Sequence, residues 1–204
     1  KELNLVYIYT GAMYRALALA CLRSGIPTKA ADRVQQKLNE LTIELTRPPV
    51  TSRQPYQVLL NDEDVTEKIF NQDVAMAASD VSVIPQVRKT MVHRQQAMAR
   101  GQAVVVEGRD IGSRLLPRAQ FKIYLTASPE ERARRRWRQW QVAGGSQSIE
   151  QVETDTRLRD EQDMSRATDP LRKLPDAWKL DTTNLTEEEV VAQIKEELKK
   201  RHLL

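Results

Sequence analysis

The stretch AVVVEGRDIG at residues 103–112 decides how the rest of this sequence is interpreted. It opens with a short apolar run, which is typical of a parallel strand buried on both faces. Such a strand delivers the residues that follow it to the carboxyl edge of the sheet, where open α/β folds bind ligands. Arg109 and Asp110 come next, and we expect Arg109 to hold a phosphate and Asp110 to accept hydrogen bonds from a polar ligand. The alternative is a charged turn that follows a core strand.

The composition is that of an ordinary globular protein. The chain has 204 residues, of which 40% are hydrophobic and 29% charged, so it forms either one α/β domain with an insert or two small domains. The net charge of +4 suits anionic ligands but is too small and scattered to indicate a nucleic-acid-binding protein. The single cysteine, Cys21, lies in an apolar run and fits a core thiol in a reducing compartment. Because no membrane span or signal peptide is evident, we expect a cytoplasmic protein with no membrane partner.

Strand and helix patterns alternate along most of the chain, which predicts an α/β fold with a parallel sheet flanked by helices. The expected strands are residues 3–8, 103–106, 121–125 and 178–181. The expected helices cover residues 10–24, 30–41, 73–80 and 86–100, followed by helices that start near 128, 148 and 186. The exception is the segment 41–71, where short strands at 42–46 and 56–60 predict a small β-rich insert. We therefore expect an α/β core at 1–40 and 72–204, interrupted by an insert at 41–71.

Two helices carry unusual charge. The first begins at Ser128-Pro129, a strong capping signal, and has five arginines within residues 132–138. They predict either a solvated basic face or a lid, near residues 130–165, that closes on a polyphosphate. On the next helix, Arg159, Asp163 and Arg166 recur at i, i+4 and i+7, which places them on one face. The alternative for these three is an ordinary salt bridge with a neighbouring arginine.

Four segments in fixed order together resemble bacterial cytidylate kinases: TGAMYR at 10–15, ASDVSVIPQVR at 78–88, EGRDIG at 107–112 and RLRDEQDMSR at 157–166. The resemblance runs from residue 3 to residue 198. It implies transfer of the ATP γ-phosphoryl group to CMP or dCMP, giving CDP or dCDP, with Mg²⁺ bound through the nucleotide. It also implies a three-layer, P-loop nucleoside monophosphate kinase-like fold in which 41–71 is the monophosphate-binding insert. We expect CMP, dCMP and ATP as partners, no nucleic acid, and a monomer.

The resemblance also implies roles for single residues. The positions that read the cytosine ring are Ser79, Arg88 and Asp110. The arginines that hold the acceptor phosphate are Arg15, Arg109 and Arg166. Arg159 matches a further phosphate ligand, Asp163 and Thr10 lie near the sugar, and Arg132 and Arg135 lie near ATP. The candidate catalytic residues are therefore arginines, because phosphoryl transfer needs aligned phosphates and neutralised charge rather than a protein nucleophile.

The sequence departs from the family pattern in two main places. No G-x-x-x-x-G-K-[ST] motif occurs within the 204 residues, so we expect the first strand and the P-loop to be absent from the chain as printed, which would leave it with negligible turnover. Tyr9 stands before Thr-Gly where the family usually has Asp, an acid that commonly supports the metal's water shell. Smaller departures are Asp169, where Ala is usual, and Trp178 late in the chain.

Three interpretations stay open at this point. The chain is a cytidylate kinase without its first segment, including the case of one cut from a fusion to another enzyme; or it is a catalytically inactive homologue that binds CMP; or it is a basic RNA-binding module. The third rests only on the arginines of 132–138, and no aromatic stacking motif accompanies them.

Overall fold

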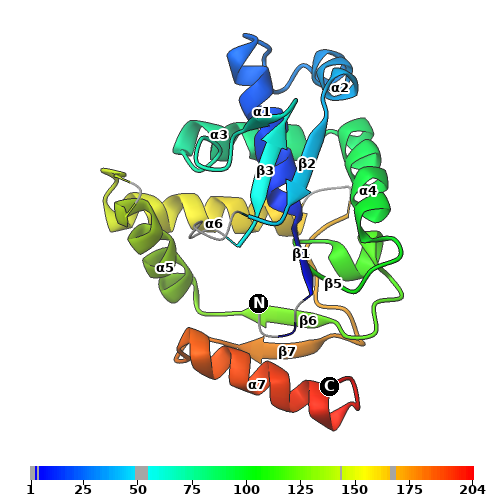
Figure 1. Ribbon diagram of the computed structural model, residues 1–204. Helices are drawn as coiled ribbons and strands as arrows, with labels where there is room; N and C mark the ends of the chain where they lie inside the picture. Colours follow the sequence, from blue (N-terminus) through cyan, green and yellow to red (C-terminus); the bar gives the residue numbers. More distant parts are fainter. Residues whose placement is uncertain (1–2, 4, 49–54, 143, 166–168) are drawn as a thin grey trace. The chain divides into compact units, whose positions relative to one another are not determined.

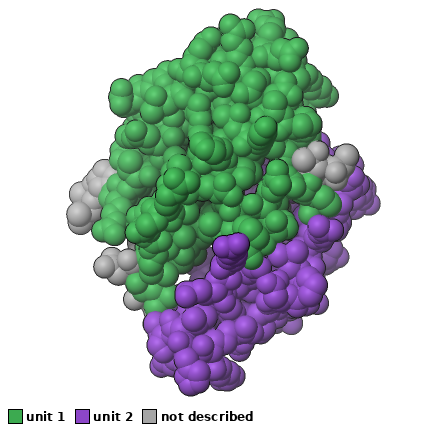
Figure 2. All heavy atoms as spheres, turned by 90° about the vertical axis from the view of Figure 1, so that its right-hand side faces the viewer, with its two compact units in different colours: residues 1–117, 166–170 green, residues 118–165, 171–204 purple. Residues whose placement is uncertain are grey.

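The computed structural model describes residues 3, 5–48, 55–142, 144–165 and 169–204. Its elements divide into two compact units, which Figure 2 distinguishes by colour. Unit 1 comprises residues 1–117 and 166–170, and unit 2 comprises residues 118–165 and 171–204.

Unit 1 contains a two-stranded parallel sheet. Strand β1 (Val6–Tyr9) pairs with β5 (Val104–Glu107) in a register that sets Val6 opposite Val104 and Tyr9 opposite Glu107. Helix α1 (Thr10–Arg23) begins at the residue after β1. The carboxyl ends of both strands and the start of α1 therefore meet at one place, as the sequence predicted for the edge of a parallel sheet.

Helix α1 is the centre of the core of unit 1. Its side chains Met13, Ala16 and Leu17 have no exposed surface, and Cys21 is equally buried. The helix packs against α2 (Ala31–Glu40), α3 (Gln72–Ser82) and α4 (Pro85–Ala99). The prediction of a core thiol is confirmed, and burial raises the pKa of Cys21, so this thiol is a poor nucleophile.

Residues 41–71 contain a three-stranded antiparallel sheet formed by β2 (Ile43–Thr46), β3 (Gln57–Leu60) and β4 (Glu63–Asp64). Strands β2 and β3 lie against α1 (Figure 1). The turn between β3 and β4 uses Asn61 and Asp62 in the left-handed region, with φ of 47° and 68°, a conformation that these residues tolerate. The predicted strands are confirmed, whereas the role of this segment as a separate monophosphate-binding insert stays a prediction.

Unit 2 contains a second two-stranded parallel sheet, β6 (Ile123–Thr126) and β7 (Trp178–Asp181), with helices α5 (Pro129–Val142), α6 (Ile149–Ser165) and α7 (Glu187–Lys200). The predicted helix starts are confirmed. Ser128 accepts from Glu131 N at 3.2 Å, and Thr186 forms a capping box with Glu189. These caps satisfy amide groups that the first turn of a helix leaves without partners.

The predicted class, an α/β fold with parallel sheets flanked by helices, is confirmed, but one detail of it is wrong. The run at 104–106 was expected to be buried on both faces, whereas Val105 is 46% exposed and its neighbours are half-buried. Strand β6 behaves in the same way, since Leu125 is 57% exposed. In the described residues each strand pairs with one other strand, and the exposure of Val105 and Leu125 shows that one face of each strand is not fully covered by packed side chains.

Candidate functional site

The carboxyl ends of β1 and β5 are joined by a hydrogen bond that sequence reasoning missed. Thr10 Oγ1 donates to the carbonyl of Glu107 at 2.8 Å. A Cβ atom at Gly108 would lie 2.4 Å from that hydroxyl and 2.6 Å from Ile111 Cδ1, so the approach requires glycine. Thr10 therefore bonds across to β5 and does not cap α1. Tyr9 is the N-cap, and its side chain makes no capping bond.

The loop after β5 is held by its own backbone. A single π-helical turn, η1 (Ile111–Leu115), follows Asp110 directly. The carbonyl of Asp110 accepts from the amide of Arg114 at 2.9 Å and from the hydroxyl of Ser113 at 3.2 Å. Short π-helical turns are frequent at functional sites, and this one fixes the backbone of a predicted base-reading residue.

Arg88 is the most deeply buried charged side chain of the predicted site. It lies on α4, is 3% exposed, and donates from Nη2 to the carboxylate of Asp110. Its Nη1 donates to the carbonyl of Ser82 at 3.1 Å, and its Nε lies 3.4 Å from Asp169 Oδ2. We call Arg88, Asp110, Asp169 and the Ser82 carbonyl the Arg88 cluster. A buried charge is tolerated only when it is paired and hydrogen-bonded. The contacts of the cluster meet this requirement, and because they come from different directions they hold Arg88 in one orientation.

Arg15 reaches away from α1 toward the segment at 41–71. Its Nη1 donates to the carbonyl of Ile69 at 2.9 Å, and its guanidinium carbon lies 5.4 Å from the centre of the Phe70 ring. The second contact has the geometry of a cation–π interaction. The alternative of a solvated helix arginine does not hold for Arg15, because both contacts fix the side chain.

A cluster of aromatic rings lies beside β1 and next to Arg15. Tyr56 lies 5.4 Å from Tyr9, 5.8 Å from Tyr7 and 6.4 Å from Phe70 between ring centres. The Tyr9 ring covers Gly11, where an added Cβ would meet the ring at 2.9 Å. The phenol of Tyr7 donates to the carboxylate of Glu107, and burial, together with this bond, raises the Tyr7 pKa. Tyr9, which stands where the family usually has Asp, is thus part of an aromatic cluster, a role that the sequence did not indicate.

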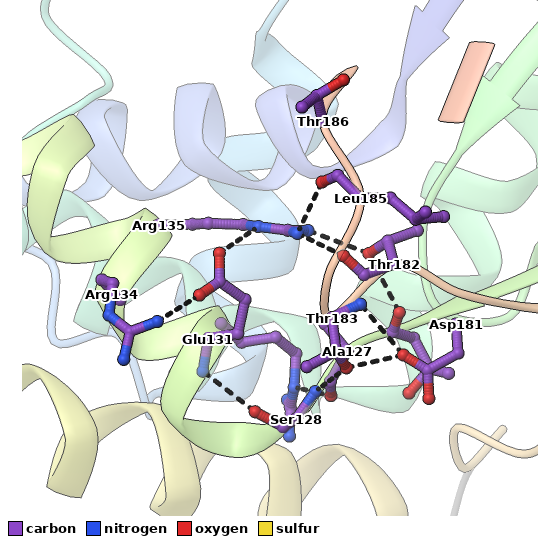
Figure 3. Close-up of polar contacts among 12 residues, drawn as sticks. Ala127, Ser128, Glu131, Arg134, Arg135, Asp181, Thr182, Thr183, Leu185 and Thr186 are labelled. Atoms are coloured by element: carbon purple, nitrogen blue, oxygen red, sulfur yellow. Dashed lines mark hydrogen bonds and ion pairs between the residues drawn. The ribbon is translucent and has the colours of Figure 1, made fainter. Parts of the chain in front are cut away.

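In unit 2, two arginines of α5 hold the helix to its own unit. Arg132 donates from Nε to the carbonyl of Ala127 at 3.1 Å and pairs with Asp160 on α6. Arg135 points toward the turn after β7, where its Nη1 donates to Thr182 Oγ1 at 2.9 Å and its Nη2 to the Thr182 carbonyl (Figure 3). Its Nε bonds to Glu131 at 3.0 Å. The expected contacts of both arginines with ATP stay predictions.

The remaining predicted residues are placed as follows. In unit 1, Ser79 lies on α3 and Arg109 follows β5, both half-buried. In unit 2, Arg159 and Asp163 lie four positions apart on α6 and are also half-buried. Arg166 lies outside the described residues. Of the predicted residues, the structure brings Arg88 and Asp110 into direct contact.

Asp160 and Asp169 are functional candidates that pattern reasoning did not select. Asp169 contacts Arg88 across 81 positions of sequence, and Asp160 contacts Arg132 across 28. No local spacing reveals such contacts. The only sequence signal was that Asp169 departs from the residue usual at its position.

Comparison with known proteins agrees with this arrangement. A family model described as cytidylate kinase matches residues 1–200. A cytidylate kinase of Geobacillus thermodenitrificans (strain NG80-2) is 45% identical over 98% of this chain and 88% of its own length. The cytidylate kinase of Symbiobacterium thermophilum is 43% identical over 95% of this chain and 84% of its own length. That of Limosilactobacillus reuteri (strain DSM 20016) is 40% identical over 98% of this chain and 86% of its own length.

The family-model match spans both units and the four segments from which the resemblance was first drawn. With this match and relatives 40–45% identical over nearly the whole chain, the chain belongs to the cytidylate kinase family of phosphotransferases.

Proposed function

We propose that the protein to which these 204 residues belong transfers the γ-phosphoryl group of ATP to CMP or dCMP, giving CDP or dCDP. The observation that carries the proposal is the buried contact between Arg88 and Asp110 beside the carboxyl ends of β1 and β5. The relatives, which are named cytidylate kinases, support a kinase rather than an inactive CMP-binding homologue.

Arg88 and Asp110 offer a donor and an acceptor side by side in a largely buried setting, with 3% and 16% of their side chains exposed. Cytosine presents an exocyclic amino group where uracil presents a carbonyl oxygen. Asp110 can accept from the amino group, but it would face the carbonyl with no proton to share. A buried group left without a partner is costly, so sites of this kind reject the wrong ligand strongly.

The acceptor phosphate would be held by arginines. Arg15 and Arg109 come from the elements that follow β1 and β5, and Arg166 is the third expected contact. Their planar guanidinium groups match two oxygens of a phosphate at once. We assign the ATP side of the reaction to Arg132 and Arg135, with Arg159 as a further phosphate ligand and Asp163 and Thr10 near the sugar.

The reaction needs no protein nucleophile, because the attacking atom is an oxygen of the CMP phosphate. As the family resemblance implies, we place Mg²⁺ on the phosphates of ATP, where it would neutralise charge on the transferred group. Among the described residues there is no group of three or more His, Cys, Asp or Glu side chains that could hold a metal ion. In the same part of the chain, none of the helices has both the length and the apolar character of a membrane span. The protein's own contribution is to align the phosphates and exclude water.

The test combines binding and turnover on the protein that contains residues 1–204. Titration calorimetry with CMP and UMP should show preference for CMP, and Asp110→Ala should abolish that preference. A coupled assay for ADP should then show turnover with CMP. Equal affinity for CMP and UMP in the unmodified protein would refute the base assignment, and CMP binding without ADP formation would refute the kinase assignment.

A further inference from the structure

We infer that Thr182 is a positioning residue for the phosphoryl donor, which acts by orienting Arg135. The inference rests on the proposed function, because that proposal places Arg135 on the ATP side of the reaction. It adds a residue that neither the family motifs nor the comparisons assign.

Thr182 lies where the two strands of unit 2 end. Thr126 is the last residue of β6, and it pairs with Asp181, the last residue of β7, in the parallel register. Thr182 follows Asp181 directly and begins the turn that leads to Thr186, the N-cap of α7 (Figure 3). Because open α/β sheets bind ligands at the carboxyl ends of their strands, this turn lies at the edge of the sheet where a nucleotide is expected.

The hydroxyl of Thr182 both donates and accepts a hydrogen bond. The residue is 2% exposed, and its Oγ1 donates to the carbonyl of Thr126 at 3.0 Å and accepts from Nη1 of Arg135 at 2.9 Å. A buried hydroxyl that has a fixed acceptor cannot turn freely. It therefore holds Nη1 of Arg135 in one direction relative to the end of β6.

The rest of the Arg135 guanidinium is held by neighbouring segments. Nη2 donates to the carbonyls of Thr182 and Leu185, the second at 3.5 Å, and Nε donates to Glu131 at 3.0 Å. Within the described residues, these contacts and the one to the Thr182 hydroxyl use four of the five N–H groups of a guanidinium. The fifth, on Nη1, is available to a ligand, and with 36% of the Arg135 side chain exposed a phosphate can reach this group from solvent.

This arrangement has a consequence for the donor nucleotide. Nη1 carries both the hydrogen that Thr182 accepts and the hydrogen that a phosphate oxygen would accept. Because the N–H groups of a guanidinium lie in one plane, the bond to Thr182 sets the direction of the second hydrogen. Without the hydroxyl, the plane could tilt about the bonds made by Nη2 and Nε, and a contact with phosphate would lose its alignment.

Three variants separate this role from a contribution to folding. Thr182→Val removes the hydroxyl but leaves the carbonyl of Thr126 paired, because the amide of Thr182 also donates to it at 2.8 Å. Thr182→Ser keeps a hydroxyl at the same place. Thr183→Val is the matched control, because the hydroxyl of Thr183 lies in the same turn but donates to Asp181 at 2.6 Å, and its described contacts do not include Arg135.

The experiment measures the KM of ATP and of CMP, with a coupled assay for ADP, on the protein that contains residues 1–204 and on its variants. We expect Thr182→Val to raise the KM of ATP about tenfold without changing that of CMP. Thr182→Ser should restore most of this loss, and Thr183→Val should leave both constants unchanged. In an Arg135→Ala background, Thr182→Val should have no further effect on the KM of ATP, because it acts through that arginine.

A purely structural role would change both constants equally, or lower the unfolding temperature and leave the KM of ATP as it was, and either result would overturn the inference. So would an effect of Thr182→Val that is the same with and without Arg135. If Thr182→Val does not fold, Arg135→Lys provides the test, because lysine keeps the charge but cannot reach the same acceptors together. An unchanged KM of ATP in Arg135→Lys would then overturn the inference.

In each of these cases the proposed function stands, because the unmodified protein converts CMP. If the unmodified protein forms no ADP with CMP, the proposed function itself is refuted, and the inference is refuted with it.

Discussion

The Arg88 cluster in unit 1 and the arginine-rich helix α5 in unit 2 differ in how they use charge. Arg88 is an isolated arginine in the first turn of its helix, yet it is 3% exposed and its acidic partners come from distant segments. On α5, Arg134 and Arg135 are 49% and 36% exposed and pair with Glu131 in their own helix. The number of arginines in a segment therefore says little about how strongly any one of them is bound.

The energetic expectation follows from this difference. An exposed ion pair within a helix contributes at most about 1 kcal/mol, because solvent screens it and both side chains lose freedom. A buried pair costs several kcal/mol to break, because one charge is left without its partner. The free energy of unfolding should thus respond very differently to loss of one partner of the Arg88 pair and to loss of an exposed arginine of α5.

The largest effect should come from Asp110→Ala. Breaking a buried pair typically costs about 3–5 kcal/mol, and because Asp169 still contacts Arg88, we expect a loss of about 2–3 kcal/mol in the free energy of unfolding. Urea denaturation followed by circular dichroism measures this loss. The matched variant is Arg134→Ala on α5, whose side chain is 49% exposed and for which we expect a loss of about 1 kcal/mol or less. Equal losses in the two variants would contradict the contrast between the regions.

Arg109→Lys should have the next largest effect, on binding rather than on folding. The variant keeps the positive charge but loses the forked donor geometry, so we expect CMP affinity to fall by about 1–3 kcal/mol. Calorimetry with cytidine, which lacks the phosphate, provides the control and should give the same weak affinity for variant and unmodified protein. If cytidine binding fell as much as CMP binding, Arg109 would be a structural arginine at the strand end.

Phe70→Leu should have a smaller effect. The ring lies under the guanidinium of Arg15, and such contacts contribute about 0.5–1 kcal/mol at partly exposed sites. We therefore expect CMP affinity to fall twofold to fivefold, with no change for cytidine. Because the Ile69 carbonyl also holds Arg15, the loss should stay below that of Arg109→Lys. A loss that is equal for cytidine and CMP would show that Phe70 acts on the fold and not through Arg15.

These contrasts also explain which parts of the molecule the sequence could predict. The caps at Ser128 and Thr186 were found because capping depends on residues within one turn. Strands β1, β5, β6 and β7 were found because apolar runs between helices are local patterns too. The proximity of Arg88 and Asp110 was implied only by family resemblance, and their contact spans 22 positions.

The features that escaped prediction depend on tertiary packing. The open face at Val105 could not be foreseen, because an apolar run does not record what packs on each face of a strand. Asp169 was noticed only as a departure from the family, and nothing near it in sequence points to Arg88. Tyr9 was interpreted as a lost acid, whereas its ring packs on Tyr56 and over Gly11. Each of these facts needs the positions of segments far apart in the chain.

The last expected effect concerns pH and again separates buried from exposed groups. Burial and the bond to Glu107 raise the pKa of Tyr7 above its ordinary value of 10.0. The unfolded chain therefore ionises first, so the stability that depends on neutral Tyr7 is complete below pH 10 and falls above it. In Tyr7→Phe this fall should be shallower, by at most about 1.4 kcal/mol per pH unit. Urea unfolding at pH 9, 10 and 11 compares the two slopes.

Only the difference in slope is informative, because Tyr7→Phe also loses the bond to Glu107 at every pH. Parallel slopes would mean that Tyr7 titrates in the folded protein as it does in the unfolded chain, and that the aromatic cluster is as open to solvent as the ion pairs of α5.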